Sequence, residues 1–152
     1  PEKVVVFGAR DVDKPEMKNA REDDLFFVPM YKISPRGKSS GLEKQLEETL
    51  KHFKRNGVKN LYISVDIDVL DPAVASGTGY AFPGGLSYRE LWYCLRKVVQ
   101  QFDVVGFDLV EVAPDLDTPS KVTQNTAVKI LVEFMSFVHR KEIKINKGLK
   151  TD

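Results

Sequence analysis

The chain has 152 residues, 42% of them hydrophobic and 30% charged, which is enough apolar material for the core of one globular unit. Its 23 basic and 22 acidic residues leave a formal net charge of +1, so the whole chain has no strong attraction for nucleic acid or an anionic membrane. No apolar run is long enough to span a bilayer, and the lone Cys94 cannot form a disulfide within the chain. We therefore expect a cytoplasmic protein whose partners include neither nucleic acid nor membrane.

Strand and helix patterns alternate along the chain. Residues 1–57 predict a strand over 3–7 that ends at Gly8, a helix over 13–20, a strand over 25–31 and a helix containing Leu42, Leu46, Leu50 and Phe53. Ser40 and Glu43 can form a capping box before the last helix, and Asn56-Gly57 can end it.

The later residues continue this alternation. They predict a strand over 61–65, a long loop, a helix over 88–101 capped by Ser87 and Glu90, a strand over 104–110, and a helix over 120–139 with Pro119 at its first turn. Such alternation favours an α/β fold, in which right-handed crossovers build a mostly parallel sheet covered by helices.

The most informative segment is the apolar strand that runs into Asp66 and Asp68. Residues two apart on an extended chain point to the same face, so both carboxylates can reach one cation if the extended geometry persists through Ile67. Loop capping is the alternative for a bare Asp-x-Asp. The long loop that follows, with its Gly and Pro clusters, is typical of a functional loop and favours the metal site.

A second strand delivers Glu111 to the same edge of the predicted sheet. Because parallel strands share a direction, Glu111 should lie near Asp66 and Asp68 if the two strands are neighbours. An acid beyond a cation site is suited to binding a positively charged substrate. An exposed loop acid is the alternative interpretation.

Several motifs in register resemble the carboxyl-terminal part of the ureohydrolases, the arginase and agmatinase superfamily. The motifs are Ser64-Val-Asp66-Ile-Asp68-Val-Leu-Asp71-Pro72, Gly77-Thr-Gly, Gly84-Gly85-Leu86 with Arg89-Glu90, Asp108-Leu-Val-Glu111-Val-Ala-Pro114 and, upstream, Phe7-Gly8-Ala-Arg10. The resemblance implies a three-layer αβα, arginase-like fold and a homo-oligomer. It also implies a binuclear manganese centre that hydrolyses a guanidine or amidine to urea and an amine.

Carried over by position, the resemblance makes Asp66 and Asp68 metal ligands and makes Glu111 the catalytic acid that binds the substrate guanidinium. The family's upstream histidine ligand, Asp-x-His-x-Asp cluster and proton-shuttle histidine have no match, because His52 and His139 lie in helical patterns. We therefore expect residues 1–152 to form the carboxyl-terminal portion of one ureohydrolase domain. Alone, without the amino-terminal half that carries the other ligands, this portion should be inactive.

The sequence around Asp68 resembles that of agmatinases more than that of arginases, which commonly have Gly where this chain has Val69. Agmatine, converted to putrescine and urea in polyamine metabolism, is therefore the first choice of substrate, with arginine, guanidinobutyrate and formiminoglutamate as alternatives. Tyr80 lies on the loop expected to line the pocket, and we expect it to contact substrate. Tyr80-Ala81-Phe82 occupies the positions at which many agmatinases have Thr-Pro-Glu. More remote alternatives are a magnesium-dependent phosphatase of the haloacid dehalogenase type and a noncatalytic homologue.

Overall fold

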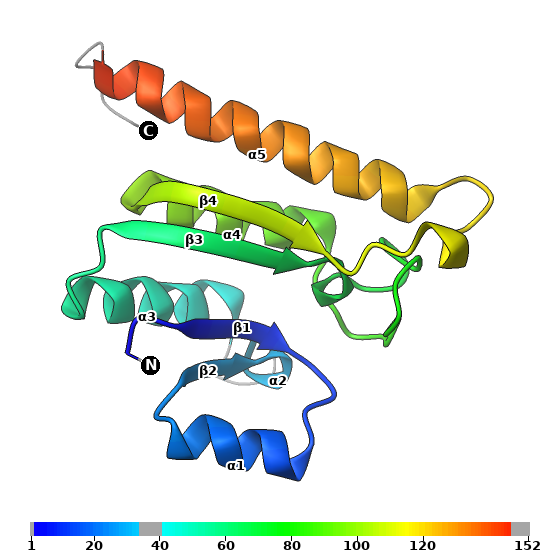
Figure 1. The fold of residues 1–152 in the computed structure, drawn as a ribbon, viewed down its shortest axis with the longest axis horizontal. Coiled ribbons are helices and arrows are strands. Elements are labelled where there is room, and N and C mark those ends of the chain that lie inside the picture. The colour runs from blue at the N-terminus through cyan, green and yellow to red at the C-terminus, as the bar shows by residue number, and fades with distance from the viewer. Residues whose placement is uncertain (1, 34–40, 147–152) are drawn as a thin grey trace. The chain divides into compact units, whose positions relative to one another are not determined.

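The structure is a computed structural model that describes residues 2–33 and 41–146, apart from the side chains of 144–146. The chain folds as two compact units, Pro1–Val58 and Lys59–Asp152, which are considered separately below. Both units pair two parallel strands and connect them through helices, as the alternating pattern predicted (Figure 1).

The first unit opens with a strand-helix-strand arrangement. Strand β1 (Val5–Ala9) and strand β2 (Phe26–Pro29) pair in parallel, and helix α1 (Lys14–Glu22) connects them. The carboxylate of Asp13 accepts the backbone N–H of Glu16, and the Glu16 carboxylate accepts the N–H of Asp13 at 2.9 Å. This capping box satisfies two donors that the first helical turn would otherwise leave unpaired.

Two predicted strand ends in this unit are wrong. Gly8 was expected to end the first strand, but it lies inside β1 at φ 87°, where the register shifts between Phe7 and Ala9. Glycine adopts this backbone geometry without steric cost, so the strand continues through the irregularity.

The second predicted strand, over residues 25–31, stops at Pro29, and the next residues form the short helix α2 (Met30–Ile33). Proline offers no N–H to a strand ladder, and the helical turn buries both Met30 and Ile33.

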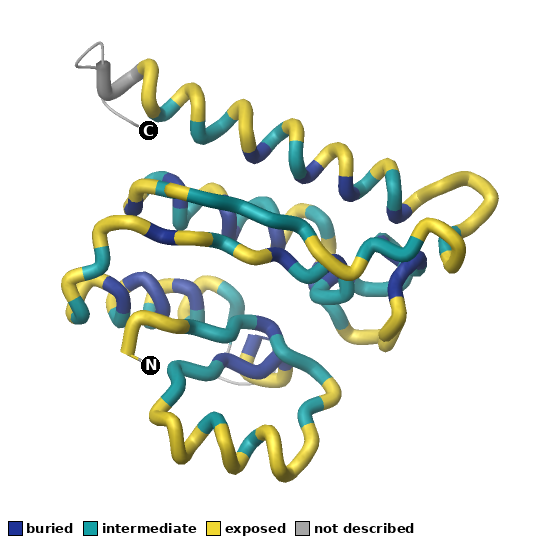
Figure 2. Tube along the Cα trace, in the orientation of Figure 1, coloured by how far each residue is buried: buried dark blue, intermediate teal, exposed yellow. Residues whose placement is uncertain are grey.

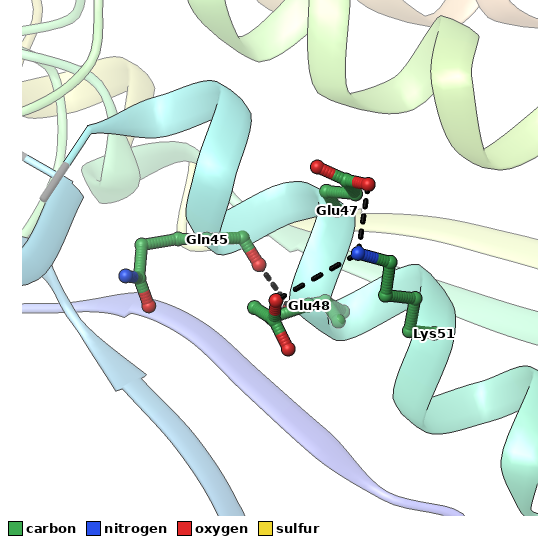
Figure 3. Close-up of polar contacts among 5 residues, drawn as sticks. Gln45, Glu47, Glu48 and Lys51 are labelled. Carbon is green, nitrogen blue, oxygen red and sulfur yellow. Dashed lines mark hydrogen bonds and ion pairs between the residues drawn. The ribbon is translucent and has the colours of Figure 1, made fainter. Parts of the chain in front are cut away.

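Helix α3 (Leu42–Arg55) confirms the predicted amphipathic pattern, because Leu46, Leu50 and Phe53 are buried on one side. Figure 3 shows the polar contacts along this helix. Lys51 Nζ lies 2.8 Å from a Glu47 carboxylate oxygen and 3.9 Å from one of Glu48, and the Thr49 hydroxyl donates to the Gln45 carbonyl at 2.9 Å. Pairs one turn apart on an exposed helix face typically add only about 0.3–0.5 kcal/mol each.

The ends of α3 were predicted with mixed success. Gly41, at φ 133°, occupies the N-cap position and provides no side-chain cap, whereas Ser40 of the predicted capping box lies outside the described residues. At the other end the prediction is confirmed: Asn56 is the C-cap, and Gly57 follows at φ 66°. A left-handed residue here stops the helix and brings its N–H to the carbonyl of Lys54 at 3.1 Å.

The second unit contains the strands that carry the candidate site. Strand β3 (Asn60–Asp66) and strand β4 (Asp103–Val110) are parallel neighbours, joined through helix α4 (Tyr88–Gln101) (Figure 1). Their register runs from Asn60 opposite Asp103 to Asp66 opposite Val110, with one irregularity after Leu61. The carboxyl ends of both strands therefore meet at one edge of the sheet.

Helix α5 (Val122–Asn146) contacts both α4 and β4. The rings of Phe107 on β4 and Phe134 on α5 stack at 4.1 Å, and Trp92 on α4 meets Phe137 on α5 edge-on at 5.9 Å. Figure 2 shows that the buried positions of α5 recur along the side of the helix that faces β4 and α4. The core of this unit lies there.

Helix α4 begins with the predicted capping box, in which the Ser87 N–H donates to the Glu90 carboxylate at 2.8 Å. The predicted start and end of α5 are wrong. Lys121 has φ 56°, outside the helical region, so the helix begins at Val122 and Pro119 lies before its first turn. The helix also continues past His139. Among the described helices, none is long and apolar enough to cross a membrane.

Candidate active site

The loop between β3 and α4 is closed at its neck by backbone pairing. The N–H of Leu86 donates to the carbonyl of Val69 at 2.9 Å, and the N–H of Asp71 donates to the carbonyl of Leu86 at 2.9 Å. The Asp71 carboxylate also accepts the N–H of Gly84 at 2.9 Å, across 13 residues. These bonds hold the two ends of the loop together, which gives Asp71 a structural role and fixes the loop against the strand edge.

The structure places Asp66 at the last position of β3 and Asp68 in the 3₁₀ turn η1 (Ile67–Val69) that follows. The condition that extended geometry persists through Ile67 is therefore not met. Ile67 is completely buried, and the Asp66 carboxylate caps the turn by accepting the N–H of Asp68 at 3.0 Å. Both acids stay at the carboxyl end of the strand and are half-buried. Their role as metal ligands stays a prediction.

Glu111 follows the last residue of β4, and the register puts that residue, Val110, opposite Asp66. The condition set by the sequence, that the two strands be neighbours, is met. Glu111 is exposed and has φ 63°, a left-handed conformation that costs a non-glycine residue energy and is enriched at functional sites. A Cβ built on Gly79 would lie 4.0 Å from a Glu111 carboxylate oxygen, so the loop after β3 runs beside this acid.

Gly77 anchors the loop to the segment that follows Glu111. Its N–H donates to the buried hydroxyl of Thr123 at 2.7 Å, and its carbonyl accepts the N–H of Ala113 at 2.9 Å. A Cβ at Gly77 would lie 2.7 Å from the Cβ of Asp117 and 2.9 Å from its Cα, closer than real contacts allow. Only glycine fits this approach.

Asp117 holds the start of α5. Its carboxylate accepts backbone N–H groups from Thr118 at 2.9 Å, Thr123 at 3.1 Å and Gln124 at 3.0 Å. Desolvation raises the pKa of this carboxyl, but the hydrogen bonds from Gln124, Thr123 and Thr118 outweigh it and lower the pKa from 3.8 to about 2. Asp117 is therefore an ionised helix cap that positions the anchor of the loop.

A second polar network joins β3 to β4 just before the ends of the two strands. The hydroxyls of Ser64 and Tyr62 donate to the two carboxylate oxygens of Asp108 at 2.5 and 2.7 Å, and these bonds lower the pKa of Asp108. Gly106 lies opposite Tyr62, and a Cβ there would come within 2.4 Å of the tyrosine ring. This network reinforces the strand register that aligns Asp66 with the end of β4.

Tyr80 lies on the loop as predicted and is 65% exposed, close to Phe82, which is 45% exposed. Between Gly77 and Gly79, Thr78 is only 4% exposed, and its hydroxyl oxygen has no hydrogen-bond partner among the described residues. The substrate contact predicted for Tyr80 stays a prediction.

In the described part of the chain, no group of three or more His, Cys, Asp or Glu side chains could hold a metal ion. His52 on α3 lies 2.8 Å from the Glu2 carbonyl and stacks on Phe26 at 4.2 Å, and His139 is exposed on α5. Asp66 and Asp68 remain the candidate ligands.

Sequence reasoning missed the structural parts played by Thr123 and Asp117 and the left-handed backbone of Glu111. A signal for Asp117 was present, because an Asp followed by Thr-Pro-Ser before a helix is a common capping pattern. No local signal pairs Gly77 with Thr123, because 46 residues separate them.

The fold agrees with solved structures of the ureohydrolase class. The crystal structure of arginase from Bacillus subtilis matches with a TM-score of 0.76 and 33% identity, over 91% of this chain and 45% of that one. The predicted arginase-like αβα fold is thereby confirmed.

A model of the arginase family matches residues 1–136, and the chain belongs to this family. It is 34% identical over 134 residues to an arginase from Staphylococcus aureus, covering 88% of this chain and 43% of that protein. It is 37% identical over 136 residues to an agmatinase from Halalkalibacterium halodurans, covering 89% and 42%. The chain thus spans less than half the length of these relatives.

Proposed function

We propose that the full-length protein hydrolyses a linear guanidine to urea and an amine at a binuclear manganese centre, with agmatine as first choice. The observation that carries this proposal is the meeting of Asp66 and Glu111 at the carboxyl edge of two neighbouring parallel strands, in a chain of the arginase family. Ligands of open α/β sheets bind at such edges. We further propose a cytoplasmic homo-oligomer, as the family resemblance implies.

Asp66 and Asp68 would hold the metal. Carboxylate oxygens suit a hard divalent cation, and both side chains lie at the loop end of β3. Two aspartates cannot complete two ions, so the remaining ligands would come from outside these 152 residues. When bound, paired divalent ions supply a water activated at neutral pH and a positive charge beside the reacting carbon.

Glu111 would accept two hydrogen bonds from the guanidinium and hold it in place. Glu111 has a left-handed backbone and is exposed at the edge of the sheet. These properties support a role in binding and not in packing the core. Because Gly79 has no side chain, the loop leaves room beside that carboxylate.

Arginine is the second candidate substrate, because arginases stand beside an agmatinase among the relatives. Val69, where arginases commonly have Gly, supports agmatine. Family membership removes the basis for the phosphatase alternative. The noncatalytic alternative is tested below.

The experiment uses the full-length protein and compares Asp66→Asn with Glu111→Gln. Asp66→Asn should keep the fold but lose bound manganese, because an amide binds the cation more weakly than a carboxylate. Glu111→Gln should keep the metal yet lose roughly 2–4 kcal/mol of transition-state binding, which is about thirty- to a thousandfold in kcat/KM. The measurements are elemental analysis and urea release from agmatine, arginine and guanidinobutyrate.

Asp103→Asn is the matched control, since it removes an exposed acid at the start of β4, at the opposite end of that strand from Glu111, and should leave both readouts unchanged. Full manganese occupancy in Asp66→Asn would remove this residue from the metal site. Metal loss in Glu111→Gln would make it a ligand, and unchanged kinetics would refute guanidinium binding. No urea release by the unaltered protein loaded with manganese would support the noncatalytic alternative.

A further inference from the structure

The loop beside Glu111 presents a pair of exposed aromatic rings. The ring centroids of Tyr80 and Phe82 lie 6.2 Å apart with planes 33° from parallel, and the N–H of Phe82 donates to the carbonyl of Tyr80 at 2.9 Å. Their exposed fractions of 65% and 45% show that neither ring serves the core of its unit. Adjacent aromatic faces in a functional loop can bind apolar chains and cations.

This pair lies close to the candidate guanidinium site. Gly79, which borders the Glu111 carboxylate, directly precedes Tyr80. At no more than about 3.6 Å per residue, Phe82 is within about 11 Å of Gly79 along the chain. The pair is therefore placed to meet the part of a substrate that extends away from Glu111.

The two loops beside this pair are rich in acids. Residues 66–88 and 108–120, which form the two loops and the adjoining strand ends, contain no Lys or Arg. Apart from the proposed metal ligands, their acids are Asp71, Asp108, Glu111, Asp115 and Asp117. Within these two segments a substrate tail that ends in a carboxylate meets no cation, although Arg89 and Lys121 directly follow them and Lys129 lies 5.8 Å from the Tyr88 ring. A cationic tail meets acids and ring faces there.

We propose that Tyr80 and Phe82 form a specificity element that selects guanidines with a cationic or apolar tail over guanidines with a carboxylate tail. This inference rests on the proposed function and deepens it. The two rings contact the methylene chain of the substrate, and their negative faces attract a terminal ammonium, while the acidic surroundings disfavour a terminal carboxylate.

The test compares kcat/KM for agmatine and for 4-guanidinobutyrate in the full-length protein loaded with manganese. Phe82→Lys places a cation at the rim and should lower the agmatine to guanidinobutyrate ratio by about tenfold or more. Phe82→Leu keeps an apolar side chain but removes the ring, and should lower kcat/KM for agmatine by about two- to fivefold.

Gln101→Lys is the matched control, because it adds the same charge at an exposed position before the start of β4, at the opposite end of that strand from Glu111. It should leave the ratio unchanged. Thermal melting and size-exclusion chromatography of each variant show whether the fold and the oligomer survive.

An unchanged ratio in a folded Phe82→Lys variant would overturn the inference while leaving the proposed function intact. An equal loss for both substrates, or dissociation of an oligomer, would also overturn it, by showing that the rings support the site or cover another copy. Failure of the unaltered protein to release urea from any of the guanidines would refute the proposed function first and this inference with it.

Discussion

Replacing Gly77 with alanine should destabilise the protein, because the new side chain prevents the loop from packing against Asp117 and Thr123. The added Cβ would lie 2.7 Å from the Cβ and 2.9 Å from the Cα of Asp117, whereas carbon atoms pack best at about 3.5–4.0 Å. The loop or the start of α5 must therefore move by about 1 Å. Because the nearest atoms include backbone, a side-chain rotation cannot relieve the overlap.

The magnitude follows from two costs. Forcing an extra carbon into a close-packed contact typically costs about 1–3 kcal/mol. Movement of Gly77 also strains the bond from its N–H to the fully buried hydroxyl of Thr123, and an unmet buried hydrogen bond costs about 1–3 kcal/mol. We expect Gly77→Ala to lower the free energy of unfolding by about 2–6 kcal/mol.

Urea unfolding of the full-length protein, followed by circular dichroism, measures this difference as a shift of the midpoint. The matched control is Gly79→Ala, two residues along the same loop, where the new Cβ would make only an ordinary 4.0 Å contact. Such a substitution should change stability by less than about 1 kcal/mol. Equal midpoints for the two variants would refute the argument from close approach.

Two other predictions concern single titratable groups. The folded-state pKa of Asp117, about 2, lies below its ordinary 3.8, so its contribution to stability is present above pH 4 and is lost as the pH falls through about 2. Between about pH 2 and 5, the melting temperature should therefore change less with pH for Asp117→Asn than for the unaltered protein. The same pH dependence in both proteins would contradict this. Burial raises the pKa of Cys94 on α4 to about 12, so a thiol reagent at pH 8 should modify it far more slowly in the folded protein than in urea. Equal rates in the two states would show that the thiol is accessible.

The sequence by itself determined the features that depend on neighbouring residues. Apolar runs predicted β3 and β4, the Ser87 and Glu90 pair predicted the start of α4, and Asn56-Gly57 predicted the end of α3. These signals are local, since a cap or a periodic face is formed within a few residues. Motifs in register also predicted the arginase family.

Only the tertiary structure decided how the candidate site is arranged. Alternation along a strand predicts the burial of Ile67 beside Val65, but not the 3₁₀ turn over Ile67–Val69 that the Asp66 carboxylate caps. Glu111 reaches its left-handed conformation where β4 ends beside the loop that Gly77 anchors. That anchor joins Gly77 to Thr123 and Asp117, far along the chain, and contacts of this kind depend on packing between distant segments. The acids could be read from the sequence, but their mutual placement follows from the pairing of β3 with β4, because that pairing fixes which residues share an edge.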